Sequence, residues 1–363
     1  MRETREESAW RVELMEGESS ISRCWVVDRR LRVGRAALVT GGIGGVGTLE
    51  AHRHRGYSRQ VLEYAVKLME RERLELSFLH GIRDYYHRFG FITCMAEHDF
   101  SLEVRDAERA LAGARTRPIR TGDRRRLIDL YNRDNLERTG SAVRDPKTWS
   151  GFHRGSQYSV PGAVQVVVDG RDRPLGYVVY DRVEDRCRAP EVGGQGEAVF
   201  AAILGFLARR AVRLRRERIH FNLPVDHPFA VYCLDYGLQV STLHPRNGGG
   251  MGRIVDLMAC LRALLPELER RWGDQDRGLT LGLRTDLGTA TLAWQQGRLT
   301  LATGAGRQTA RLGHAHLTQL LMGYVGVSDL VGLNRLQGPR PLLALMARLF
   351  PRQQAQLWWA DRF

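Results

Sequence analysis

Short apolar runs and polar–apolar alternation dominate the first part of the chain. Residues 10–15 alternate, and residues 21–27 and 36–40 are mostly apolar, with Gly17 near the first turn. Runs of this length bounded by turn residues are typical of strands, and they predict an antiparallel meander. Over residues 61–69 the apolar positions recur every three to four residues, which predicts a helix.

The same two periodicities continue to the end of the chain, with two breaks. Residues 105–121 are polar and rich in alanine and arginine, so we expect a linker there, and the glycines of residues 247–252 mark a second break. Strands are expected at residues 74–80, 163–168, 175–180, 219–223, 279–283, 289–294 and 298–302, and helices at residues 127–131, 198–209, 261–268, 316–322 and 341–349.

The chain is strongly basic, with a net charge of +14 over 363 residues, and almost all of its positive charge is arginine because Lys67 and Lys147 are the only lysines. Basic proteins attract polyanions, so nucleic acid is a conceivable partner. The arginines, however, gather in runs such as residues 124–126 and 209–218, which have helix-like patterns and no interleaved aromatic residues. We therefore expect solvated helix faces and no nucleic-acid partner.

Length and composition indicate a cytoplasmic protein of two or three domains. A hydrophobic content of 43% is sufficient for packed cores, and the longest uncharged apolar run, residues 198–208, is too short to span a bilayer. The charged start lacks the pattern of a signal peptide. Five widely spaced cysteines without a C-x-x-C pair predict reduced core thiols and no metal site.

Candidate chemistry concentrates in residues 41–62, GGIGGVGTLEAHRHRGYSRQVL, where a strand passes through glycines into a helix. Gly42, Gly44 and Gly47 match G-x-G-x-x-G, the fingerprint of dinucleotide-binding folds. That fingerprint requires the helix to begin within the glycines, whereas here the helical pattern begins only after Gly56. A dinucleotide site is therefore disfavoured, and an anion site at the N-terminus of the later helix is favoured.

The turn before that helix, Arg53-x-x-Gly56-x-Ser58, resembles the (Q/R)-x-x-G-x-(G/A) signature of the GNAT acetyltransferase superfamily, which binds the diphosphate of acetyl-CoA. Successive N–H groups and a helix dipole attract such an anion, and Gly56 allows close approach. Arginines add charge-assisted hydrogen bonds, while Ser58 departs from the signature but is nearly as small. The resemblance assigns cofactor binding to Val46, Thr48, Arg53, Arg55, Gly56, Tyr57 and Ser58.

Residues 81–91, GIRDYYHRFGF, follow the predicted strand at 74–80 and resemble the other half of the GNAT core. In that superfamily a tyrosine at this place protonates the departing thiolate of coenzyme A, so the resemblance assigns the general acid to Tyr86. A phenol of pKa near 10 is close enough to a thiol of pKa about 8.5 for this transfer. The alternative is that Tyr86, like its neighbour Tyr85, is a core aromatic residue.

A weak internal repeat indicates a second domain of the same kind. Residues 229–238, FAVYCLDYGL, echo the tyrosine, aromatic and glycine pattern of residues 86–91. The equivalent of the phosphate turn, residues 192–197, lacks arginine and ends in Glu197. We therefore expect a degenerate GNAT domain that does not bind coenzyme A and serves as scaffold.

The last part, with a helix, an antiparallel meander and further helices, resembles a sterol carrier protein-like domain, which can hold a lipid or can serve packing and oligomerisation. The order of these three parts resembles the enhanced intracellular survival (Eis) family of N-acetyltransferases. The implied fold is α+β, with GNAT domains at residues 1–105 and 106–255 and a sterol carrier protein-like domain at 256–363. The opening strand and two helices of a GNAT domain are not evident in the first domain.

The end of the chain, residues 358–363 (WWADRF), supports the same resemblance. In the Eis family the free carboxylate of a C-terminal phenylalanine reaches into the active site as a base, which implies that role for Phe363. An α-carboxylate has a pKa near 3.5, so it is a weak base that needs a closed site. Glu50, His52 and His54 are the other candidate bases.

The resemblance implies an N-acetyltransferase that uses acetyl-CoA as co-substrate and no metal. The acetyl group would pass directly, in a ternary complex, to a primary amine of an aminoglycoside-like molecule, a peptide or protein lysine, or a small amine. The Val46 N–H would polarise the thioester carbonyl. A homo-oligomer, a hexamer in the family, is expected. The alternatives are a non-catalytic CoA-binding or scaffold protein and a lipid carrier acting through the last domain.

Overall fold

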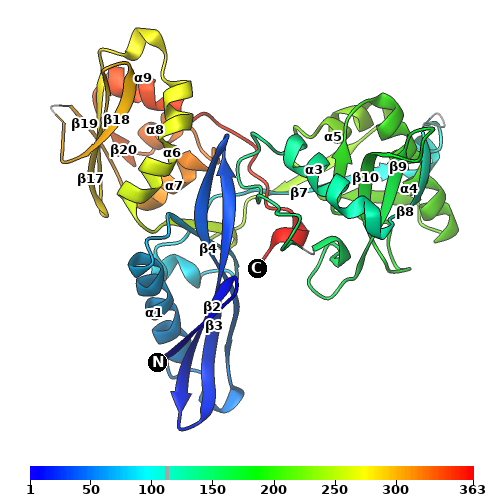
Figure 1. The fold of residues 1–363 in the computed structure, drawn as a ribbon, viewed down its shortest axis with the longest axis horizontal. Helices are drawn as coiled ribbons and strands as arrows, with labels where there is room; N and C mark the ends of the chain where they lie inside the picture. Colours follow the sequence, from blue (N-terminus) through cyan, green and yellow to red (C-terminus); the bar gives the residue numbers. More distant parts are fainter. Residues whose placement is uncertain (111–113, 150, 307) are drawn as a thin grey trace. The chain divides into compact units, whose positions relative to one another are not determined.

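The structure, a computed structural model, describes residues 1–110, 114–149, 151–306 and 308–363 (Figure 1). The chain forms two compact units, each assembled from segments that are distant in sequence. Unit 1 contains Met1–Ala96, His244–Ala355 and Phe363, and unit 2 contains Glu97–Leu243 and Gln356–Arg362. The alternating strands and helices of the sequence pattern are present in both units, as expected for an α+β protein.

Unit 1 begins with a seven-stranded sheet in the order β1-β2-β3-β4-β5-β15-β6, in which β4 and β5 are the parallel pair. Helix α1 packs along this sheet (Figure 1), where its Leu62 and Met69 are fully buried in one core with Val12 and Val26. The elements are β1 (Arg2–Glu6), β2 (Ala9–Glu16), β3 (Ser19–Val33), β4 (Ala36–Thr48), η1 (Glu50–His52), α1 (Tyr57–Arg71), β5 (Leu76–Gly81), η2 (Tyr86–Phe89), β6 (Ile92–Thr93) and β15 (Gly249–Ile254).

The sequence pattern missed strand β1, because its residues RETRE are polar throughout. The strand is the edge of the sheet, where both faces can remain solvated. Polar partners hold it: Arg2 donates to Glu13 over 2.6 Å, and Glu3 accepts from Tyr64 at 2.8 Å and from Arg71 at 2.7 Å. All the elements that the structure describes before Glu50 are strands.

The second part of unit 1 is a five-stranded sheet in the order β18-β17-β16-β19-β20 with helices packed on it. It joins the first part through Glu267 on α6, which the backbone N–H of Arg35 contacts at 3.4 Å, and through His314 on α7, whose Nε2 lies 3.2 Å from the Gly90 carbonyl oxygen. The elements are α6 (Leu257–Arg271), η6 (Asp274–Asp276), β16 (Thr280–Thr285), β17 (Gly288–Gln295), β18 (Arg298–Thr303), β19 (Thr309–Leu312), α7 (His314–Leu321), α8 (Val327–Gly332), β20 (Leu336–Gln337) and α9 (Arg340–Leu349).

Unit 2 contains two four-stranded sheets, in the orders β12-β10-β9-β8 and β11-β13-β7-β14, with one core between them and their helices. The elements are β7 (Glu97–Glu103), α2 (Val104–Ala107), β8 (Arg115–Pro118), η3 (Thr121–Asp123), α3 (Arg124–Asp134), η4 (Gly151–His153), β9 (Gly162–Val168), β10 (Pro174–Asp181), β11 (Arg188–Ala189), β12 (Glu191–Gly194), α4 (Glu197–Arg213), β13 (Arg218–Phe221), α5 (Pro228–Tyr232), η5 (Cys233–Tyr236), β14 (Gln239–Leu243) and η7 (Trp359–Asp361).

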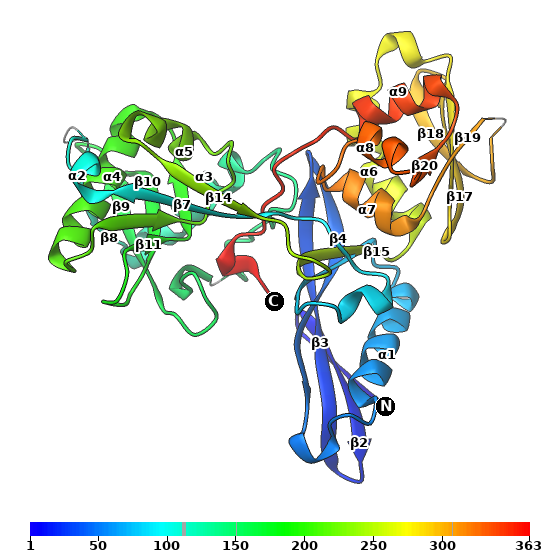
Figure 2. The same cartoon turned by 180° about the vertical axis from the view of Figure 1, so that it is seen from behind.

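The units divide the chain at places other than the expected domain ranges. Strand β7 follows the first GNAT segment in sequence but pairs with β13 and β14 in unit 2 (Figure 2). Strand β15 lies near the end of the expected second domain but pairs with β5 and β6 in unit 1. The expected linker at residues 105–121 instead contains most of α2 and all of β8, which pairs with β9. Residues 111–113 of that range lie outside the described part.

Candidate active site

Strand β4 is the element around which the candidate site forms, because it loses one of its two neighbours midway. On one side it pairs with β3 as far as Thr48. On the other side it pairs with β5 only from Thr40 to Gly42. Strand β5 continues to Gly81 beside β15. Residues 43–48 therefore form one side of an opening between two parallel strands, with no ladder partner from β5.

Two glycines of β4 receive the last residue of the chain. A Cβ atom added to Gly42 would lie 2.1 Å from Cδ1 of Phe363, and one added to Gly44 would lie 2.9 Å from the carboxyl carbon of Phe363. These two positions share a face of the strand, since side chains alternate. Gly41 faces the other way, where an added Cβ would collide with Met69 of α1 at 2.5 Å. The glycines thus allow Phe363 to lie directly on the strand backbone.

A bulge in the β3–β4 ladder lies next to this contact. The register shifts between Arg23 and Trp25, so that Trp25 pairs with Gly44. Gly45 has a φ of +58°, in the left-handed region, and an added Cβ there would be 2.8 Å from the Trp25 ring. A residue other than glycine would be strained at this position. The bulge therefore depends on Gly45, a glycine that the G-x-G-x-x-G pattern does not include.

The predicted anion turn lies between β4 and α1, as the sequence indicated. Helix α1 begins at Tyr57, its N-cap is Gly56 with a φ of 77°, and no side chain caps its first turn. The space around Gly56 is open, because nothing lies within 4 Å of an added Cβ. Arg53 is largely exposed and lies 4.0 Å from the exposed carboxylate of Glu50. The turn thus presents uncapped N–H groups and arginine side chains to solvent.

Ser58 and Tyr85 connect this turn to the segment after β5. Their hydroxyl oxygens are 2.6 Å apart, and the ring of Tyr85 packs edge-on against Tyr86 with centroids 5.0 Å apart. Tyr86 is 9% exposed and lies in the core with Phe89. An added Cβ on Gly81, at the end of β5, would be 2.9 Å from the Tyr86 ring. Tyr86 therefore lies at the end of β5, on the far side of the opening from β4.

The other candidate bases belong to the turn itself. Glu50 is almost fully exposed. His52 has its Nε2 3.8 Å from Glu16, and its Nδ1 has no hydrogen-bond partner among the described residues. His54 is exposed and adopts a φ of 62°. The positions of these three side chains are those of turn residues, whereas the carboxylate of Phe363 lies on the strand.

The segment that precedes Phe363 is anchored in unit 2, and no sequence pattern predicted its partners. Asp361 accepts hydrogen bonds from Trp149 at 2.7 Å and from Arg144 at 2.9 Å. Arg144 also donates to both carboxylate oxygens of Glu191, at 2.6 and 2.7 Å. Burial alone would lower the pKa of the Arg144 guanidinium, but Asp361 and Glu191 raise it well above its ordinary value. The indole of Trp358 donates to Asn135 over 2.9 Å.

The turn of unit 2 that corresponds to the phosphate turn is filled by the protein itself. The Gly194 N–H donates to the carboxylate of Asp134 over 2.7 Å. An added Cβ on Gly193 would lie 2.2 Å from the ring of Tyr177. An acidic side chain thus accepts the hydrogen bond of a backbone N–H group at this turn.

The fold and its sequence resemble those of known proteins. An acetyltransferase (GNAT) domain family model matches residues 2–94, and a sterol carrier protein domain family model matches residues 269–358. No curated protein matches the chain. Eis1 of Mycobacterium abscessus is 16% identical, with a TM-score of 0.65 over 99% of this chain and 91% of that one.

The chain therefore contains an acetyltransferase (GNAT) domain and a sterol carrier protein domain, and its fold is similar to that of Eis1.

Two further solved structures agree with this assignment. A probable N-acyltransferase of Enterococcus faecalis V583 is 18% identical, with a TM-score of 0.78 over 98% of this chain and 89% of that chain. A GCN5-related N-acetyltransferase of Anabaena variabilis is 16% identical, with the same TM-score over 98% of this chain and 90% of that chain. These structures confirm the expected fold, and the two family models confirm the expected GNAT-type acetyltransferase domain and sterol carrier protein domain.

Three further observations bear on membrane, metal and nucleic-acid sites. No helix of the described residues is long and apolar enough to cross a membrane. Across the same described ranges, no group of three or more His, Cys, Asp or Glu residues is placed to hold a metal ion. The basic runs are largely solvated, as expected: Arg125, Arg126, Arg209, Arg213 and Arg215 are exposed on or beside their helices.

Proposed function

We propose that the chain is an N-acetyltransferase that moves the acetyl group of acetyl-CoA to a primary amine in a ternary complex. One observation carries the proposal: the stretch of β4 without a β5 partner, residues 43–48, leads within a few residues to the uncapped N-terminus of α1. An extended pantetheine arm can pair with a strand edge, and a diphosphate can bind a helix N-terminus.

The residues present suit acetyl-CoA, which supplies an activated thioester and a polyanionic diphosphate. Val46 and Thr48 belong to the stretch of β4 without a β5 partner, so their backbone N–H groups would meet the thioester end. Arg53, Arg55, Gly56, Tyr57 and Ser58 would hold the diphosphate. The hydroxyl of Ser58 is engaged by Tyr85 at 2.6 Å, so its contribution would come from its backbone N–H.

The chain's own groups then account for each proton. The amine nitrogen attacks the thioester carbon, whose carbonyl oxygen accepts a hydrogen bond from the Val46 N–H. As the carbon–sulfur bond breaks, Tyr86 donates its proton to the sulfur. The Phe363 carboxylate, which lies on β4 at Gly44, accepts the proton that the amine loses. The products are the amide and the free thiol.

Direct transfer without an acyl-cysteine intermediate is supported by the state of the thiols. All five cysteines are buried and none forms a disulfide. Burial raises the pKa of the Cys24 and Cys187 thiols to about 12 and raises those of the other three as well. A thiol must lose its proton to act as a nucleophile, so these groups are poorly suited to that role.

The finer parts of the proposal follow from the resemblance. The acceptor would be an aminoglycoside-like molecule, a peptide or protein lysine, or a small amine. The protein would act in the cytoplasm as a homo-oligomer, a hexamer by family resemblance, and without a metal. Sedimentation of the purified chain would measure the oligomeric state directly.

The activity can be tested by following free thiol released from acetyl-CoA in the presence of a panel of amines. We expect amine-dependent release. The double variant Arg53→Gln, Arg55→Gln should raise the KM for acetyl-CoA about tenfold with little change in kcat, because it removes binding shared by ground and transition states. Arg59→Gln is the matched control: Arg59 is exposed on α1 and lies 3.7 Å from Glu63.

The alternatives give different results in the same experiment. Coenzyme A binding without thiol release for any amine would indicate a non-catalytic CoA-binding or scaffold protein. A chain that neither binds coenzyme A nor releases thiol, but retains lipid in native mass spectrometry, would indicate a lipid carrier instead.

A further inference from the structure

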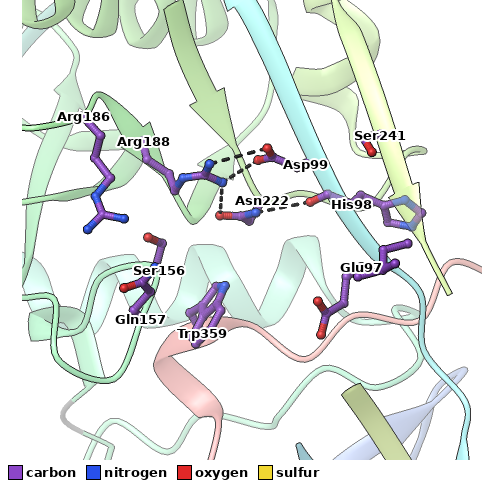
Figure 3. Close-up of a pocket in the computed structure, with 11 residues that line it drawn as sticks. Glu97, His98, Asp99, Ser156, Gln157, Arg186, Arg188, Asn222, Ser241 and Trp359 are labelled. Carbon is purple, nitrogen blue, oxygen red and sulfur yellow. Dashed lines mark hydrogen bonds and ion pairs between the residues drawn. The ribbon is translucent and has the colours of Figure 1, made fainter. Parts of the chain in front are cut away.

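Unit 2 contains a cavity that the proposed acetyl transfer does not use. Its volume is about 420 Å³, within the range of small-molecule sites. Residues of β7, β11 and β14, the loop at 156–157 and the C-terminal segment line it (Figure 3). All of these residues belong to unit 2, so the cavity is complete within that unit.

One wall of the cavity is a closed polar network. Arg188 forms an ion pair with Asp99 and donates to the Asn222 side-chain oxygen over 3.0 Å. The Asn222 amide donates in turn to the His98 carbonyl oxygen at 3.3 Å, as the dashed lines of Figure 3 show. Arg188 and Asp99 neutralise each other, so this wall shapes the cavity but adds no net charge to it. The charge of the lining must come from other residues.

Arg186 supplies guanidinium donors at one end of the cavity, although its charge is shared with two neighbouring carboxylates. Its Nε lies 3.3 Å from Asp185 and 3.7 Å from the fully buried Asp181. Its two terminal nitrogens make no hydrogen bond within the described part of the chain, and Figure 3 shows one of them on the side of Ser156. The side chain of Gln157, beside Arg186 in the same view, adds an amide that no described residue engages. A planar guanidinium with two available donors suits a carboxylate.

Glu97 supplies an anion at the other end, with Trp359 between the two (Figure 3). The Glu97 carboxylate has no hydrogen bond or ion pair to any described residue. Burial lowers the pKa of the Arg362 guanidinium to about 10, and the charge of Glu97 opposes that shift. Arg362 covers one face of the Trp359 ring, with its guanidinium carbon 3.6 Å from the ring centroid. A carboxylate without a partner suits an ammonium group, which gains from the opposite charge.

We propose that this cavity binds a small amino-carboxylate, with the ligand carboxylate on Arg186 and its ammonium group between Glu97 and Trp359. A diamine would bring one ammonium against Arg186, and a dicarboxylate would bring one carboxylate against Glu97. Both would leave a charge facing a like charge, which is how a site of two opposite ends selects its ligand. This binding does not depend on the proposed acetyl transfer. That the ligand is also an acetyl acceptor rests on the proposed function.

Calorimetric titration of the full chain without acetyl-CoA tests the binding with three ligands of equal chain length: ε-aminocaproate, hexamethylenediamine and adipate. We expect ε-aminocaproate to bind at least about tenfold more tightly than the other two, the scale of one charge-assisted contact. Arg186→Gln should remove the preference over the diamine, and Glu97→Gln should remove the preference over adipate. Arg186→Lys, which keeps the charge, should retain part of the preference.

Arg213→Gln is the matched control, because Arg213 is exposed on α4 and does not line the cavity. Equal affinity of the wild-type chain for all three ligands, no saturable binding of ε-aminocaproate, or affinities unchanged in both Arg186→Gln and Glu97→Gln would overturn the proposal. Thiol release from acetyl-CoA separates it from the proposed function. Tight ε-aminocaproate binding without thiol release for any amine would support the amino-carboxylate site and contradict the proposed acetyltransferase activity. Thiol release with other amines and no ε-aminocaproate binding would support the activity and contradict the site.

Discussion

Substitution of Gly42 by alanine should displace Phe363 from β4. The added Cβ would lie 2.1, 2.2 and 2.4 Å from three atoms of the Phe363 ring. Carbon atoms in contact are normally about 3.5–4.0 Å apart. The backbone at Gly42 is paired with both β3 and β5, so it cannot easily retreat. The last residue of the chain is the freer partner, and we expect it to move.

The cost to stability should be small and the cost to turnover large. Burial of a complete phenylalanine side chain stabilises by roughly 1.5–3 kcal/mol, and Phe363 is only partly buried, so about 1 kcal/mol should be lost. Removal of a general base, in contrast, slows proton transfer by a factor of about 100 or more. Gly42→Ala should therefore lower kcat about 100-fold while the denaturation midpoint shifts only slightly.

Two comparison variants separate this mechanism from a general disturbance of β4. An added Cβ on Gly47 meets nothing closer than 4.0 Å, so Gly47→Ala should unfold at the same denaturant concentration as the wild type. Phe363→Ala removes the ring with which the new methyl group at position 42 would collide. The double variant Gly42→Ala, Phe363→Ala should therefore be no slower than Phe363→Ala alone, a non-additivity expected of contacting residues.

The measurements are thiol release from acetyl-CoA with a saturating amine and unfolding in urea. Full activity of Gly42→Ala would refute the role of the Phe363 carboxylate as the general base. Strictly additive losses in the double variant would show that Gly42 acts through something other than Phe363.

Three further outcomes follow from the same geometry. Tyr86→Phe should lower kcat about 100-fold with coenzyme A affinity unchanged, because only the proton donor is lost; equal kcat in thiol-release assays would contradict this. Arg144→Met should destabilise unit 2 by about 3–5 kcal/mol in urea unfolding, since Asp361 and Glu191 lose their buried counter-charge, and an unchanged midpoint would exclude the ion-pair anchor. Hydrogen bonding from Arg117 lowers the pKa of Asp123 in the folded protein. The pair therefore stabilises the fold fully above the unfolded-state pKa of about 3.9, and this stabilisation is lost as the pH falls through the lower folded pKa. Asp123→Asn should flatten this part of the curve of unfolding free energy against pH.

Periodic segments were predictable because their pattern is local. The apolar spacing of residues 61–69 predicted α1, and the helix indeed begins at Tyr57, directly after Gly56. The apolar runs at residues 163–168 and 175–180 predicted β9 and β10 within one residue. The apolar residues of a buried face recur with the period of the helix or strand that carries them, so their spacing indicates the type of element.

Segments without a repeating buried face could not be predicted in this way. Strand β14 has the sequence QVSTL and is exposed at every residue, so it is a strand only because β7 lies beside it. Strand β7 belongs to unit 2 and β15 to unit 1, although their places in the sequence suggested the opposite. The composition of the two segments does not indicate this. Strand pairing between distant segments depends on backbone partners, which the side-chain pattern does not record.

The candidate site shows the same division. The sequence alone, with its family resemblance, proposed three candidates: the turn at Arg53–Ser58, the tyrosine at residue 86 and the aromatic residues at 358–363. Each depends on residue types at short spacing. Only the tertiary structure decided that Phe363 lies on Gly42 and Gly44, which are more than 300 residues away in sequence. It also decided that Arg186 and Glu97 line one cavity. Collision, burial and charge act between atoms in space, so they become visible only once the chain has folded.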